Sequence, residues 1–222
     1  MKTVTLEKLL EVGAHLGHQA KRWNPKMDKY LYTVKDGVHV FDLAKTKEAL
    51  EESLAALKKA KKEGKVILLI GTKKQAKEKL TEVAKKAGMP YIAERYLGGS
   101  LTNFDQILRS IKHILGLKKD FENGEFGTYT KKERLLIERK IIKSESIYGG
   151  ILSLTKLPDM LFIVDTHREI GAVKEAQKLN IPVVGVVDSN GDPDLVDYII
   201  PMNDDASSSV EYVLELVEEA LK

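Results

Sequence analysis

VILLI, at Val66–Ile70, is a run of five aliphatic residues, and two similar runs follow it: MLFIV at Met160–Val164 and VVGVV at Val183–Val187. Short apolar runs bounded by turn or polar residues are typical of strands buried on both faces of a parallel sheet. Shorter strand candidates lie at Tyr91–Ile92 and Tyr198–Ile200. Helical patterns separate the strands, at Lys45–Glu63, Lys73–Ala87, Arg168–Leu179 and Ala206–Leu221. This alternation predicts an α/β fold with a mainly parallel sheet of about five strands, covered by helices on both faces.

A short segment before the first helix departs from this alternation. Tyr30–Asp42 holds two apolar stretches around the dipeptide Asp36-Gly37. An Asp-Gly pair between apolar stretches is a strong signal for a two-residue turn, so we predict an antiparallel β-hairpin here.

The stretch from Asn103 to Ile147 has no strand pattern. Thr130 and Glu133 have the spacing of a capping box at the start of a second helix. The apolar residues on one face of each helix are Phe104, Ile107, Leu108, Ile111, Ile114 and Leu115, and then Leu136, Ile137, Ile141 and Ile142. We therefore predict an antiparallel, coiled-coil-like helical hairpin at 103–148, inserted into an α/β domain formed by 1–102 and 149–222.

Bulk properties narrow the class of protein. The chain has 222 residues, 43% of them hydrophobic, which suits a globular protein with a buried core. It has no cysteine, which excludes disulfides, thiolate zinc sites and a thiol nucleophile. No apolar run approaches the roughly 20 residues of a membrane-spanning helix, and the N-terminus does not resemble a signal peptide. We expect a cytoplasmic protein with no membrane partner.

The charges are distributed unevenly. Residues 1–148 carry 31 Lys and Arg against 19 Asp and Glu, a balance of +12, whereas residues 149–222 carry 5 against 14, a balance of −9. A polyanion bound by the N-terminal part would account for the asymmetry. Lysine-rich helices that are simply solvated would account for it equally well, so charge alone leaves both interpretations open.

The segment Gly13–Lys29, GAHLGHQAKRWNPKMDK, is the first candidate binding site. It combines groups that neutralise phosphates, form directional hydrogen bonds and stack on unpaired bases. Its candidate residues are His15, His18, Gln19, Lys21, Arg22, Trp23, Asn24, Lys26 and Lys29. In the alternative interpretation the two histidines cap or pack locally and the tryptophan anchors the core.

Two further loops follow predicted strands. Gly71–Gln75 (GTKKQ) joins a strand to a helix N-terminus, where free backbone N–H groups can bind an anion. It lacks the Walker A spacing, and the chain has no GxGxxG, so nucleotide binding has no support. Arg95–Asn103 (RYLGGSLTN) brings polar groups to the start of the inserted helices. The candidates in the two loops are Lys73, Lys74, Arg95, Ser100, Thr102 and Asn103. An ordinary strand-to-helix turn and a helix cap are the alternatives.

Acidic residues follow three of the predicted strands, at Asp165, Asp188–Asp194 and Asn203–Asp205. Active sites of open α/β sheets lie at this edge, so a phosphate-handling enzyme is an alternative function. No spacing supplies a nucleophile or a matched acid–base pair. A calcium loop starting at Asp188 fails, because Pro193 takes its sixth position and Ile199 its twelfth.

We predict that none of these acidic residues is catalytic and that none of them binds a metal ion. Their ordinary role is to cap turns and helix N-termini. The one arrangement that would hold a divalent ion is His18 with Asp188 or Asp205.

Seven strings in order resemble segments of the bacterial small-subunit ribosomal protein two family, from Leu9 to Ala206. They are LLEVGAHLGHQAKRWNPKM, VFDLAKT, LIGTKKQA, RYLGGSLTNF, LPDMLFIVDT, EAQKLNIPVVGVVDSNGDPD and IPMNDDA. Each string is modestly specific, but the ordered set is very specific. The resemblance implies a Rossmann-like (flavodoxin-like) three-layer α/β sandwich with a protruding helical hairpin, and a non-catalytic protein without a cofactor.

The same resemblance implies a structural constituent of the small ribosomal subunit. Its partners would be small-subunit ribosomal RNA at the head–body junction and neighbouring ribosomal proteins, including the messenger-capturing protein one, with no small-molecule substrate. The candidate residues of the three loops would then contact RNA. Ser207–Glu211, Met202 and the second inserted helix depart from the family pattern, so no contacts are carried over to them. A protein-binding scaffold, with the inserted hairpin as the docking element, remains a further hypothesis.

Overall fold

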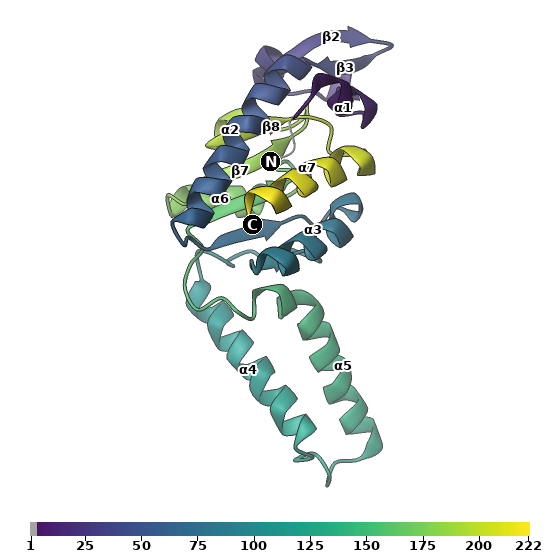
Figure 1. Cartoon of the computed structure of the whole chain (residues 1–222). Coiled ribbons are helices and arrows are strands. Elements are labelled where there is room, and N and C mark those ends of the chain that lie inside the picture. The colour runs from purple at the N-terminus through teal and green to yellow at the C-terminus, as the bar shows by residue number, and fades with distance from the viewer. Residues whose placement is uncertain (1–3) are drawn as a thin grey trace.

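A parallel sheet of five strands forms the centre of the structure, a computed structural model that describes residues 4–222 (Figure 1). The strand order is β5-β4-β6-β7-β8, and every neighbouring pair is parallel. The strands are β4 (Ile67–Ile70), β5 (Tyr91–Ile92), β6 (Met160–Val164), β7 (Val183–Val187) and β8 (Tyr198–Pro201). The predicted α/β class and the sheet of five parallel strands are confirmed.

Successive residues of these strands enter hydrophobic clusters on opposite faces of the sheet. Leu69 packs with one set of helices, whereas its neighbours Leu68 and Ile70 pack with the other. Every residue of β6 and β7 is buried. Burial of each large apolar side chain contributes about 1.5–3 kcal/mol, so both faces need a helical cover. The covering helices are α2 (Leu43–Lys62), α3 (Lys74–Ala87) and α7 (Ser207–Ala220) on one face, and α6 (Ile170–Lys178) with the start of α4 (Phe104–Glu122) on the other. The result is a Rossmann-like three-layer sandwich.

A second sheet, antiparallel and three-stranded, precedes the parallel one in the chain. Its order is β1-β3-β2, with β1 at Leu16–Gln19, β2 at Leu31–Lys35 and β3 at Val38–Phe41. The turn between β2 and β3 has positive φ angles of 53° at Asp36 and 78° at Gly37, as a two-residue hairpin turn of type I′ requires. The predicted hairpin is therefore present. The sequence does not predict β1, because LGHQ has no apolar alternation.

Shorter elements complete the N-terminal part: α1 (Leu6–Glu11), followed by the 3-10 segments η1 (Ala20–Arg22) and η2 (Pro25–Tyr30). Met27 of η2 and Phe41 of β3 pack against Val187 at the end of β7. This small hydrophobic cluster joins the antiparallel sheet to the parallel one.

Helices α4 and α5 (Lys131–Tyr148) extend away from the sheet (Figure 1). The predicted capping box is present, since the side chain of Thr130 accepts from the backbone of Glu133 and the Glu133 carboxylate accepts from the backbone of Thr130. An ion pair of 2.7 Å between Lys118 and Glu145 links the two helices. Their apolar stripes are only partly buried, because Leu115, Leu136 and Ile142 stay exposed. No helix within residues 4–222 is long and apolar enough to cross a membrane.

The hairpin returns to the sheet at the 3-10 turn η3 (Gly149–Ile151). Here the Gly150 backbone lies directly against Tyr91 of edge strand β5. A Cβ added at Gly150 would clash with the Tyr91 carbonyl oxygen and lie 2.8 Å from Cδ2 of the ring. Only glycine permits this approach.

We expect Gly150→Ala to lower the free energy of unfolding by about 1–3 kcal/mol, because overpacking against rigid backbone costs that much. Urea unfolding measures the change. The matched control is Gly149→Ala, where an added Cβ would meet no atom within 4 Å. Equal stability losses in the two variants would contradict the tight contact.

Candidate functional site

The carboxyl ends of the parallel strands bring a lysine and several carboxylates together. Lys73 follows β4, Asp165 follows β6, and Asp204 and Asp205 follow β8. The Lys73 Nζ lies 2.6 Å from Asp204 Oδ1, 2.6 Å from Asp205 Oδ1 and 3.3 Å from Asp165 Oδ2. Lys73 is only 8% exposed, so its ammonium is committed to this cluster and does not reach the surface.

The cluster shifts the pKa values of its members. Burial by itself lowers the pKa of Lys73, but the charge of Asp204 and hydrogen bonds to Asp204 and Asp205 raise it above its ordinary value. Burial, together with the charges of Asp188 and Asp165, raises the pKa of Asp204. Asp165 also holds a left-handed backbone with φ of 63°, which is uncommon outside glycine. Three carboxyl groups pair with the Lys73 ammonium, and a fourth, that of Asp188, raises the pKa of Asp204, so acidic groups outnumber the cations Lys73 and His18 at this edge.

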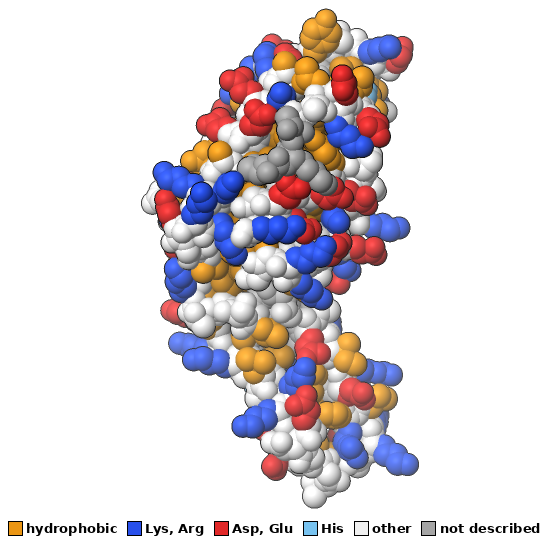
Figure 2. Space-filling view, in the orientation of Figure 1, with side chains coloured by type: hydrophobic (Ala, Val, Ile, Leu, Met, Phe, Trp, Pro, Cys, Tyr) orange, Lys and Arg blue, Asp and Glu red, His pale blue; other side chains and the backbone are white. Residues whose placement is uncertain are grey.

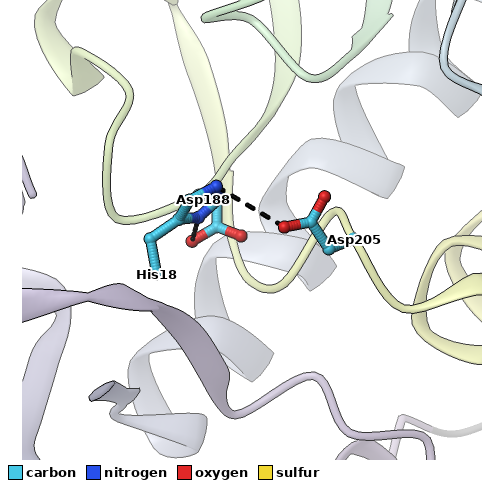
Figure 3. Close-up of side chains that lie close together, drawn as sticks. All are labelled: His18, Asp188 and Asp205. Atoms are coloured by element: carbon cyan, nitrogen blue, oxygen red, sulfur yellow. Dashed lines mark ion pairs between the residues drawn. The ribbon is translucent and has the colours of Figure 1, made fainter. Parts of the chain in front are cut away.

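His18 of β1 extends the cluster (Figure 3). Its Nδ1 lies 3.1 Å from Asp188 Oδ1 and its Nε2 lies 3.5 Å from Asp205 Oδ2. A hydrogen bond to Asp188 raises the pKa of His18, against a smaller lowering by burial. The backbone N–H of His18 donates to Ser189 Oγ at 2.8 Å, which fixes β1 against the loop after β7.

The structure thus brings together the three metal candidates of the sequence. One ligand atom each from His18, Asp188 and Asp205 lies within 4.8 Å of the others. An imidazole nitrogen and two carboxylate oxygens are ligands that a divalent cation such as zinc accepts, with a further position left for water.

Three cations of the Gly13–Lys29 segment point outward. Lys21 and Arg22 on η1 are exposed and have no ion-pair partner among the residues that the structure describes. Lys29 on η2 is exposed as well, with its Nζ 5.2 Å from the centre of the Tyr30 ring. Gln19, just before η1, is also exposed.

Other candidates of this segment are used internally. Lys26 pairs with Asp192 at 2.9 Å and with Asp194 at 3.0 Å. The Trp23 ring is half-buried with its centre 4.8 Å from that of His39.

Two polar candidates of the same segment also have structural surroundings. Asn24 caps η2, because its Oδ1 accepts from the backbone of Lys26, and its own N–H donates to Ser189 at 2.7 Å. His15 is half-buried, and its Nδ1 has no hydrogen-bond partner among the described residues.

The loop before α4 folds around an internal anion. The backbone N–H groups of Gly99, Leu101 and Thr102 donate to the Glu175 carboxylate at 2.6, 3.0 and 3.0 Å, and Thr102 Oγ1 adds a bond of 3.0 Å. Ser100 is buried and donates to the Leu97 carbonyl at 2.6 Å. Converging N–H groups of this kind bind an anion, but their convergence is visible only in the structure, so sequence reasoning missed Glu175.

Two cations and an amide of these loops remain at the surface. Lys74 and Arg95 are exposed without an ion-pair partner in the described chain. Asn103 is the exposed N-cap residue of α4, although its side chain does not cap the helix.

A second acid, Glu169, was not singled out from the sequence. It is buried, accepts from the Thr72 hydroxyl, and its pKa is raised by burial. The Nε of Arg168 in turn donates to Thr72 Oγ1 at 3.1 Å.

Comparison with known proteins decides the family. A family model described as "Ribosomal protein S2" matches residues 9–222. The chain belongs to the ribosomal protein S2 family. Proteins named "Small ribosomal subunit protein uS2" are similar over nearly the whole chain: 48% identical in Nitratiruptor sp. (98% of this chain, 82% of the relative), 47% in Chlorobaculum tepidum (97% and 87%) and 44% in Coprothermobacter proteolyticus (100% and 82%).

Membership in the S2 family makes the chain a structural constituent of the small ribosomal subunit, with ribosomal RNA and ribosomal proteins as the class of partner. The enzyme hypothesis is thereby excluded, since the S2 family is not a family of enzymes. The buried lysine–carboxylate cluster therefore needs no catalytic role. It holds the ends of β4, β6 and β8 together at one edge of the sheet.

We expect Lys73→Met to lower the free energy of unfolding by about 3 kcal/mol at pH 8, because removal of one partner leaves buried carboxylates uncompensated. The deficit relative to the natural chain should shrink towards pH 5. Without the ammonium, the folded-state pKa of Asp204 rises further above its unfolded value, so the folded variant binds protons that the unfolded chain has lost, and its stability falls as the pH rises.

The matched control is Lys74→Met, one residue along, which is exposed and should change the stability by no more than about 0.5 kcal/mol. Urea unfolding at several pH values measures both variants. A deficit for Lys73→Met that does not vary with pH would refute the electrostatic explanation.

Proposed function

We propose that this chain binds small-subunit ribosomal RNA at the head–body junction through Lys21, Arg22 and Lys29, with Lys74 and Arg95. The observation that supports this most directly is that these side chains are exposed and form no ion pair with the described part of the chain. Each can therefore neutralise a phosphate without first breaking an internal pair. Gln19 and Asn103, also exposed, supply hydrogen bonds that fix the register.

The charge distribution supports RNA contacts by the exposed cations Lys21, Arg22, Lys29, Lys74 and Arg95, which we call the rim, and not by the buried cluster at the centre of the sheet edge. Lys73 already pairs with Asp165, Asp204 and Asp205, so its buried ammonium is not free to neutralise a phosphate. Lys74 begins α3 directly after Lys73, and Arg95 follows β5, whereas Lys21, Arg22 and Lys29 lie on η1 and η2, after His18 of β1. The remaining candidates are buried, half-buried or held by bonds within the protein, and they give these segments their shape: His15, His18, Trp23, Asn24, Lys26, Lys73, Ser100 and Thr102.

Replacing Lys21, Arg22 and Lys29 together by Ala should weaken binding to small-subunit RNA and flatten its salt dependence, by about one unit of log K against log salt for each phosphate that is no longer neutralised. Filter binding at several salt concentrations measures both effects. The melting temperature should hardly change, because all three side chains are exposed.

The matched control replaces Lys59, Lys62 and Lys85 by Ala. These lysines are equally exposed but lie near the C-terminal ends of α2 and α3, at the amino end of the sheet, where Figure 2 shows Lys and Arg gathered. Equal losses of affinity in the two triple variants would mean that only net charge matters, and would refute the proposed site.

We further propose that the helical hairpin helps to seat ribosomal protein one. Leu115 on α4 and Leu135, Leu136 and Ile142 on α5 are exposed, and Figure 2 shows hydrophobic side chains interspersed among charged ones along the hairpin. Exposed apolar side chains gathered in this way are typical of a protein contact.

Replacing Leu136 and Ile142 by Ser should reduce the protein one that sediments with small subunits and leave RNA affinity unchanged. Deleting 114–140, which keeps the start of α4 that packs on the sheet, should abolish the recruitment of protein one. The same deletion tests the predicted division into domains, because an independent α/β domain should still unfold cooperatively. Full recruitment of protein one by both variants would exclude the hairpin as its seat.

A further inference from the structure

A groove of about 450 Å³ runs between α3 and the base of the hairpin. Lys77, Glu78 and Thr81 of α3 form one wall, and the last turn of α5 forms the other. Tyr91 of the edge strand β5 and the glycine pair of η3 close the floor. None of the candidate RNA-binding residues lines this groove.

The charges in the groove are opposite to those of its surroundings. Three carboxylates line it, those of Glu78, Glu94 and Glu145, against the single ammonium of Lys77. Lys77 pairs with Glu94 at 2.5 Å, and Glu145 pairs with Lys118 of α4 at 2.7 Å. Glu78 is exposed and has no ion-pair partner within residues 4–222. The part of the chain that forms the groove, within residues 1–150, otherwise carries an excess of Lys and Arg.

This charge pattern indicates which kind of ligand the groove can bind. Lys77 is already paired with Glu94, and Glu78 has no ion-pair partner among the described residues, so a phosphate would find no free cation in the groove and one unpaired carboxylate. A peptide carrying Lys or Arg would meet complementary charge instead. We propose that this groove binds an extended, lysine- or arginine-containing segment of another protein of the small subunit. This proposal rests on membership in the S2 family but not on the proposed RNA-binding residues. The groove and the RNA contacts can therefore be tested, and can fail, separately.

The floor of the groove also suits such side chains. The half-buried side chains of Tyr91 on β5 and Ile147 on α5 offer apolar surface. The aliphatic stems of Lys and Arg pack on surface of this kind while their charged ends reach carboxylates. The close contact between Gly150 and Tyr91 fixes the chain after α5 against the edge strand at the floor of the groove.

The test places a photoreactive residue in the groove of the full-length chain within reconstituted small subunits, as Ser146→p-benzoylphenylalanine. Ser146 lines the groove and is exposed. Illumination should crosslink it to a segment of another ribosomal protein in which Lys and Arg outnumber Asp and Glu, as identified by mass spectrometry. Adding Glu78→Lys should lower the crosslink yield about threefold, since it replaces attraction by repulsion.

Glu48→Lys is the matched control, because Glu48 is likewise an exposed helical glutamate without an ion-pair partner in the described chain but lies on α2, outside the groove. It should leave the yield unchanged, and both variants should keep the natural melting temperature. A crosslink to RNA, a crosslink to a neutral or acidic segment, no crosslink, or equal yields in the two variants would each overturn the proposal. None of these outcomes would bear on the Lys21, Arg22 and Lys29 contacts.

Discussion

Phe162 and Ile163 are neighbours in β6, yet one packs beneath α2, α3 and α7 and the other beneath α6 and the start of α4. A strand buried on both faces needs two helical layers, and parallel neighbours need a crossover between them. Parallel pairing also makes all the strands end at one edge. The buried lysine and its carboxylates follow these strands and therefore meet at this edge, and His18 of β1 joins them through Ser189 and Asp188.

At that edge, carboxylates of the protein and phosphates of an external ligand would compete for the same lysine and arginine side chains. A cation that lies near a carboxylate of the loops after the strands forms an ion pair with it. Lys26 pairs with Asp192 in this way, and Lys73 pairs with Asp204. A cation on the outer side of a 3-10 turn, such as Lys21 or Arg22, has no such partner among the described residues. The proposed RNA contact is therefore a property of the rim, and the sheet edge itself is occupied by the protein's own charges.

Sequence patterns predicted the elements whose signals are local. The apolar runs at 160–164 and 183–187 coincide with β6 and β7, and Asp36-Gly37 and the Thr130 capping box lie where expected. Features that depend on distant partners were not predictable in this way. Lys73 and Lys74 are adjacent and chemically identical, and only carboxylates more than 90 residues later decide which one turns inward. Glu175 likewise has no local sign that it binds the loop before α4.

The hairpin is fixed at both of its ends, by the Glu175 carboxylate before α4 and by the Gly150–Tyr91 contact after α5. Beyond Ile111, which packs in the core of the sandwich, α4 continues over residues 112–122, a length of about 16 Å. A rotation of about 10° at the base would displace the far end by about 3 Å, the length of a hydrogen bond. The two contacts at the base of the hairpin therefore determine how precisely its far end is positioned in the assembled subunit.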